Sequence, residues 1–130
     1  MRILLHGPDD LTLGEFTTPG LHVEHEEGVH VHMGPLQMFV ASMGMCTASV
    51  MQAYAEQLRV GTDGLQVHLR WKVAGGPRRL DDIEMDILWP ELPESRLKAA
   101  ERAVGQCTLH NTLQHPPHMR TMVTREAARA

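Results

Sequence analysis

Aromatic residues and cysteines are scarce in this sequence. Phe, Trp and Tyr make up 4 % of its 130 residues, whereas Met occurs nine times. We therefore expect a core built largely from aliphatic and thioether side chains, which adapt readily to irregular gaps. The chain has two cysteines. In a reducing compartment, two cysteines are more often free, metal-bound or catalytic than joined in a structural disulfide.

Clusters of basic residues are also lacking. The formal net charge is -4, and no run of Lys or Arg occurs. Since nucleic-acid binding usually requires a basic patch, we expect no nucleic-acid partner. The first residues lack the apolar stretch of a secretory signal, so we expect a cytoplasmic location.

Charged residues are missing from one long stretch in the first half of the chain. Between Glu27 and Glu56 there is no Asp, Glu, Lys or Arg. The stretch nevertheless contains His, Gln, Ser and Thr, whereas a membrane-spanning helix needs about 20 predominantly apolar residues. We therefore expect no membrane span, and we predict a helix that is buried at the centre of the fold or of a dimer.

Turn formers and apolar periodicity predict the elements of secondary structure. Short strands are expected before Glu27, where Gly, Pro and Asp separate small apolar groups. A long helix is predicted from about Pro35 to Arg59, because apolar residues recur there at three- and four-residue steps and proline suits a first helical turn. The other expected elements are strands of period two at 65–73 and 83–89, a helix at 94–106 and a last strand at 119–124.

The order of these elements predicts a single α+β domain over residues 1–130. Strands that follow one another through short turns favour a largely antiparallel sheet, and the long helix would pack on one of its faces. So few elements leave much of a long central helix uncovered. A homodimer that buries this helix a second time would cover it.

The two cysteines lie in distinct local sequences. Cys46 follows Gly44 and Met45 in the predicted long helix, and Cys107 begins Cys-Thr-Leu-His-Asn-Thr-Leu at 107–113. If the thiols meet, they can perform redox chemistry: one thiolate attacks a peroxide to give a sulfenic acid, and the other thiol converts it to a disulfide. This requires Cα atoms within about 7 Å of each other. If they do not meet, both are small buried hydrophobic residues.

Together the two motifs resemble those of the OsmC/Ohr family of thiol-dependent peroxide reductases. Its members carry a Gly-Pro element and then an apolar helix that ends in Gly-X-Cys-Thr, which residues 34–47 match here. Farther along they carry Cys-Pro-Val-His-Asn-Thr-Leu, which residues 107–113 match with Thr108 in place of the proline. The resemblance covers about residues 21–124 and indicates a divergent member.

The resemblance implies an OsmC-like α+β fold in an intertwined homodimer, with the site at the subunit interface. It implies thiol-dependent reduction of a small organic hydroperoxide, in which Cys46 attacks the peroxide and Cys107 resolves the product as a disulfide. A cellular dithiol would then reduce the disulfide. No cofactor is expected.

Two departures from the family pattern concern the activation of Cys46. Peroxidatic members carry a Glu where this sequence has Leu36 and Gln37, and they use an N-terminal Arg that Arg2 does not match. Cys46 lies mid-helix, where the N-terminus of its own helix helps little, and burial would raise its pKa. We therefore expect a compensating cation. The candidates are His30, His32, His110 or an Arg that folds in from elsewhere in the chain, such as Arg120.

His110 is the strongest of these candidates as a site residue. It follows Cys107 by three residues, so on a helix the two side chains would share a face. A hydrogen-bonded structural histidine is the alternative role for His110.

Two other functions remain open. One is a non-peroxidatic OsmC-like protein that binds a small apolar ligand, which Leu36 and Gln37 favour. The other is a His/Cys metal-binding protein, because His30 and His32 would share one face of a strand and imidazoles suit zinc. We expect no physiological metal, and we interpret this histidine-rich segment as a polar strand-and-loop face.

Overall fold

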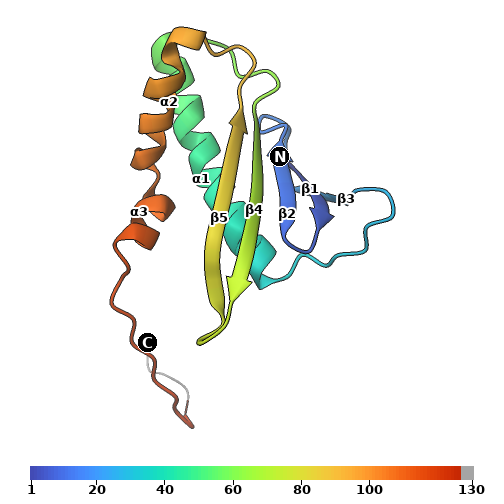
Figure 1. Ribbon diagram of the computed structural model, residues 1–130, viewed down its shortest axis with the longest axis vertical. Coiled ribbons are helices and arrows are strands. Elements are labelled where there is room, and N and C mark those ends of the chain that lie inside the picture. The colour runs from blue at the N-terminus through green and yellow to red at the C-terminus, as the bar shows by residue number, and fades with distance from the viewer. Residues whose placement is uncertain (127–130) are drawn as a thin grey trace.

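Residues 1–126 form a five-stranded sheet and three α-helices (Figure 1). The computed structural model describes residues 1–126. The strands are β1 (Arg2–Gly7), β2 (Asp10–Gly14), β3 (His22–His25), β4 (Gln66–Ala74) and β5 (Arg79–Leu88). The helices are α1 (Pro35–Leu58), α2 (Leu97–Ala103) and α3 (Thr108–Gln114), and the 3₁₀ turns are η1 (Glu94–Arg96) and η2 (Val104–Gln106).

The sheet is one layer and the helices form the other. Its strand order is β3-β1-β2-β4-β5. Strand β1 pairs antiparallel with β2, β2 with β4, and β4 with β5. Figure 1 shows α1 crossing behind the sheet, with α2 and α3 stacked beside it on the β5 side. The predicted α+β class and antiparallel hairpin are therefore confirmed, whereas β3 is an exception because it pairs parallel with β1.

The core lies between α1 and the sheet. Alternate residues of the strands face the helix, as the period-two pattern predicts. The main hydrophobic cluster combines strand residues with one face of α1: Ile3, Leu5, Leu11, Leu13, Val67, Leu69, Trp71, Val40, Ala41 and Ala48. A second cluster, which includes Met51, Trp89 and Ala100, joins the other end of α1 to α2. Aliphatic and thioether side chains thus supply most of the interior, as the composition predicts.

Gly44 sets how closely α1 approaches the sheet. A Cβ atom at this position would lie 2.2 Å from Cδ1 of Leu13 and 2.8 Å from Cδ1 of Leu69. Both leucines are fully buried, so neither side chain has free space to move into. The absence of a side chain at Gly44 therefore seats α1 against β2 and β4, and it fixes which residues of α1 point away from the sheet.

The C-terminal segment differs from the prediction. Residues 119–124 form no strand, and Met119, Met122 and Val123 are exposed. Figure 1 shows this segment running away from the body of the protein after α3. The apolar residues alone did not produce a strand, because a strand also needs a free sheet edge within reach.

The helix expected at 94–106 forms in three pieces. Turn η1 leads into α2, and η2 follows it, so the helix tightens at both ends. The long helix ends at Leu58, with Arg59 in the left-handed conformation as its cap. Among residues 1–126, no helix combines the length and the apolar character that a membrane crossing requires, which agrees with the expectation of no span.

We predict that Gly44→Val destabilises the fold. Overpacking of a well-filled core typically costs about 1–3 kcal/mol. Glu56→Val is the matched control, because it places the same side chain on an exposed position of α1. Denaturant unfolding followed by circular dichroism should show a lower midpoint for Gly44→Val alone. Equal midpoints in the two variants would show that Gly44 does not limit the packing.

Candidate functional site

The two cysteines come together between α1 and α3. Cys46 lies in the middle of α1 and is half-buried, whereas Cys107 is fully buried at the N-cap of α3. The two thiols lie close enough to shift each other's pKa, with the Cys107 thiol as the donor that lowers the pKa of Cys46. The structure therefore places in contact the two thiols that the sequence singled out, and both are in the reduced, free form.

A turn at Cys107 makes this contact possible. Its backbone is extended (φ -65°, ψ 120°), so the chain leaves η2, changes direction and starts α3 at Thr108. The Asn111 side chain donates to the Gly105 carbonyl oxygen at 2.9 Å and holds the turn closed. The first N–H groups of α3, those of Thr108 and Leu109, consequently point at the Cys46 sulfur.

These contacts separate the acidities of the two thiols. Burial raises the pKa of Cys46, but hydrogen bonds from the Cys107 thiol and from the Leu109 and Thr108 N–H groups outweigh it, so the pKa is lowered. Burial and the hydrogen bond to Cys46 raise the pKa of Cys107, against the N–H groups of His110 and Leu109. Cys46 is therefore the thiol that ionises first, and Cys107 is the proton donor. The N–H groups come from the start of α3 and not from α1, the helix that carries Cys46.

Cys46 opens into a cavity of about 520 Å³ between α1 and α2. Its lining includes the small or apolar side chains of Val50, Ala53 and Ala103. Arg102 also lines the cavity. Arg102 was not named among the cations that the sequence suggested. The sequence pattern around Arg102 gave little indication of a site role, because an exposed Arg on a short helix resembles an ordinary surface residue.

The suggested cations lie elsewhere. His30, His32 and Arg120 are exposed and do not line the Cys46 cavity. His30 and His32 lie between β3 and α1, in a segment without regular structure, so the expectation that they share a strand face is wrong. His110 lines a different cavity of about 640 Å³ and does not line the one that Cys46 lines.

Gln37, which stands where peroxidatic members carry Glu, and Arg2, which was compared with their N-terminal Arg, both bond to residues away from the thiols. Gln37 donates to the Pro8 carbonyl oxygen at 2.7 Å, which ties the first turn of α1 to the β1–β2 turn. Arg2 pairs with Glu24 at 2.8 Å across β1 and β3. Neither residue contributes to the surroundings of Cys46 described above. Where the family pattern has an acidic residue, Gln37 thus makes a structural hydrogen bond.

The fold and the thiol pair define a class of two-layer α+β proteins, with one cysteine on a central helix and the second at the start of a later helix. The chain belongs to the OsmC-like family, because the family model described as OsmC-like protein matches residues 26–122. The resemblance seen at residues 34–47 and 107–113 is therefore confirmed. No curated protein matches the chain.

Two solved structures are similar to this protein. A candidate osmotic stress induced and detoxification response protein from Psychrobacter arcticus 273-4 is 17 % identical with a TM-score of 0.58, over 66 % of this chain and 62 % of that one. An OsmC-like hydroperoxide resistance protein from Jannaschia sp. CCS1 is 26 % identical with a TM-score of 0.59, over 72 % of this chain and 69 % of that one. The match thus spans less than two thirds of the Psychrobacter protein.

We predict that Cys107→Ala raises the pKa of Cys46, because the substitution removes the thiol donor. Alkylation of Cys46 by iodoacetamide, followed by peptide mass spectrometry across a pH series, measures this pKa. Cys107→Ser is the matched control, since its hydroxyl retains a donor and should leave the pKa closer to that of the wild type. If the wild type and Cys107→Ala give the same pH profile, the Cys107 hydrogen bond does not govern the acidity of Cys46.

Proposed function

We propose that the protein reduces organic hydroperoxides through its two thiols. The observation that carries this proposal is the contact between Cys46 and Cys107, in which the more exposed thiol has the lowered pKa. A peroxide needs a thiolate nucleophile that it can reach and a second thiol to prevent over-oxidation. The arrangement supplies both, in the order Cys46 and then Cys107.

The reaction divides into three steps. The Cys46 thiolate attacks the outer peroxide oxygen, the O–O bond breaks, and the alkoxide leaves and takes a proton to become an alcohol. Cys46 is then a sulfenic acid, oxidised by two electrons. The Cys107 sulfur displaces its hydroxyl group as water and forms the Cys46–Cys107 disulfide. A dithiol reductant returns both thiols by thiol–disulfide exchange.

Two features near Cys46 fit these steps. The cavity that it lines can receive an alkyl group against Val50, Ala53 and Ala103. The Arg102 guanidinium lines the same cavity and can stabilise the thiolate and the departing alkoxide. We assign Arg102 this electrostatic role in place of the family arginine. The Jannaschia relative, described as a hydroperoxide resistance protein, supports the same substrate class.

We also propose that the protein is a homodimer that buries α1 a second time. Met38 and Met45 lie seven residues apart on this helix, and they are 59 % and 45 % exposed. Residues at this spacing share a helix face. An apolar face beside Cys46 fits a second copy of the chain better than it fits solvent.

A second candidate function is binding of a small apolar ligand. The cavity of about 640 Å³ that His110 lines lies between β5 and the α2–α3 segment, and its walls include Met43, Met85, Trp89 and Leu97. Apolar concave sites of this size suit small ligands. Cys46 does not line this cavity, so binding there would not require the thiol.

We predict that Cys46→Ser abolishes reduction of cumene hydroperoxide in the presence of a dithiol. Intact mass after a brief stoichiometric pulse should show loss of two hydrogens in the wild type and no change in Cys46→Ser. Cys107→Ser should instead accumulate a sulfenic acid that dimedone traps. Equal turnover in the wild type and Cys46→Ser would exclude the thiol mechanism, and apolar-ligand binding would then be the stronger candidate.

We predict that Met38→Glu together with Met45→Glu yields a monomer, because four buried charges at a twofold interface are costly. Sedimentation velocity of wild type and variant measures the change. His22→Glu, on the edge strand β3, is the control and should sediment as the wild type does. A wild type that sediments as a monomer would contradict the proposed dimer.

A further inference from the structure

Three metal-ligating side chains meet on the open face of the sheet, opposite α1. His6 of β1, Asp10 of β2 and His68 of β4 each offer one ligand atom, and these atoms all lie within 4.8 Å of one another. The alternation of the strands produces this arrangement, since Leu5, Leu11 and Leu69 point into the core and their neighbours point out. The cluster therefore comes from three adjacent strands that the sheet pairing holds in place.

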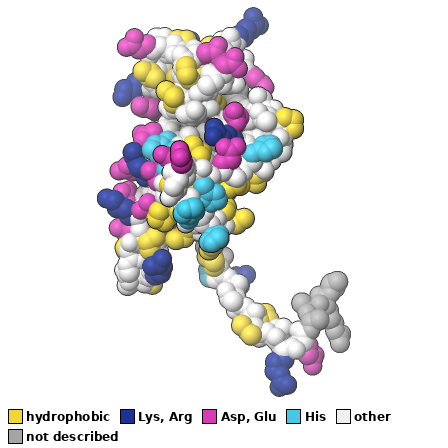
Figure 2. All heavy atoms as spheres, turned by 90° about the vertical axis from the view of Figure 1, so that its right-hand side faces the viewer, with side chains coloured by type: hydrophobic (Ala, Val, Ile, Leu, Met, Phe, Trp, Pro, Cys, Tyr) yellow, Lys and Arg dark blue, Asp and Glu magenta, His cyan; other side chains and the backbone are white. Residues whose placement is uncertain are grey.

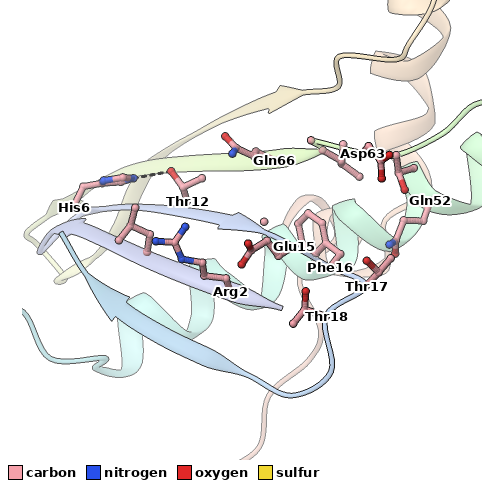
Figure 3. A pocket seen from close by; sticks show the side chains of 15 residues that line it. Arg2, His6, Thr12, Glu15, Phe16, Thr17, Thr18, Gln52, Asp63 and Gln66 are labelled. Carbon is pink, nitrogen blue, oxygen red and sulfur yellow. Dashed lines mark hydrogen bonds between the residues drawn. The ribbon is translucent and has the colours of Figure 1, made fainter.

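Hydrogen bonds orient the His6 ring. Its Nδ1 lies 2.6 Å from a Glu26 carboxylate oxygen. Its Nε2 lies 2.7 Å from the Thr12 hydroxyl, and Figure 3 shows this second contact. An ionised carboxylate can only accept, so Nδ1 is the donor, and in the neutral ring Nε2 then carries the lone pair. A carboxylate behind the imidazole is the usual outer support of a metal-bound histidine. Glu26 therefore presents His6 Nε2 to the cluster as a ligand.

Asp10 and His68 complete the ligand set. His68 Nε2 lies 2.5 Å from Asp10 Oδ1, and the two rings of His6 and His68 stand edge to face with centroids 5.6 Å apart. The cation nearest in register is Arg70, opposite Asp10, but its guanidinium is paired with Glu84 and Asp86. The Asp10 carboxylate is therefore paired with His68 and not with Arg70.

Partial burial favours a preformed site over a set of mobile surface groups. The side chains of His6, Asp10 and His68 are 24 %, 33 % and 33 % exposed. An ion can reach them from solvent, yet the strands restrict their movement. Figure 2, which looks onto the β3 edge of the sheet, shows histidine side chains at several places on that side of the molecule. This cluster is distinct from the thiol site, and it does not include His30 or His32.

We propose that His6, Asp10 and His68 bind a divalent transition metal, with zinc as the reference ion. Two imidazole nitrogens and one carboxylate oxygen suit zinc and its borderline neighbours, whereas calcium and magnesium prefer all-oxygen sites. His68 would coordinate the ion through Nε2, the nitrogen that faces Asp10. Three protein ligands leave a fourth tetrahedral position for water or another small ligand. Through Glu26, which follows β3, the ion would also strengthen the outer edge of the sheet.

Calorimetric titration of the untagged, chelator-treated protein with zinc chloride tests the proposal. We expect one zinc ion per chain, and binding that is lost in His6→Ala and in His68→Ala. Glu26→Gln should bind about 10–100-fold more weakly, because it removes only the outer support. His30→Ala removes a histidine outside the cluster and is the matched control. It should bind as the wild type does, and so should the Cys46→Ser, Cys107→Ser double variant.

X-ray absorption of the zinc-loaded wild type provides a second readout that does not depend on how the variants fold. The expected first shell contains nitrogen and oxygen with two imidazoles and no sulfur. A sulfur-containing shell, binding that survives both histidine substitutions, or no binding by the wild type would overturn the proposal. Binding lost in His30→Ala but kept in His68→Ala would move the site to the segment between β3 and α1.

Discussion

The close contact between α1 and the sheet at Gly44 is the constraint on which the rest of the structure depends. With no side chain there, the helix lies directly on Leu13 and Leu69. The same contact turns the face that carries Cys46 away from the strands and toward α2 and α3. One glycine thus links the packing of the core to the position of the more acidic thiol.

The turn at Cys107 is the second determinant of the site. Cys107 ends one helical segment and caps the next, so a single extended residue places its own thiol and two backbone N–H groups at the Cys46 sulfur. These donors are uncharged. They favour the thiolate despite burial, and they reduce the need for a cation in direct contact. This accounts for a lowered pKa at Cys46 in a chain that lacks the acidic residue of the family pattern.

The two faces of the sheet have different chemistry. The face against α1 is aliphatic and contributes to the core, and the open face carries histidines and paired charges. Strand alternation produces the division, so both the sheet and α1 lie between the His6–Asp10–His68 cluster and the thiol site. A change in one can therefore be studied with little direct effect on the other.

Local sequence predicted much of the fold because its signals act over short distances. The three- and four-residue spacing in residues 35–58 and the alternation in residues 65–73 each reflect burial of one face, which neighbouring residues determine. The strand expected at 119–124 did not form, because pairing depends on where the chain runs: after α3 this segment leaves the body of the protein and pairs with neither edge strand, β3 or β5 (Figure 1). Pairing of β3 with β1 in parallel likewise depends on the path of a loop, which leaves no local pattern.

The sequence by itself determined the family, the long helix and the two cysteines as a pair, because each has a motif that is complete within a few residues. Tertiary structure decided what surrounds the thiols. Arg102 lines the Cys46 cavity, and His110 lines a separate cavity, because of how α2 and α3 pack on α1. It also decided that His6, Asp10 and His68 meet, since strand register joins residues whose separation along the chain carries no signal.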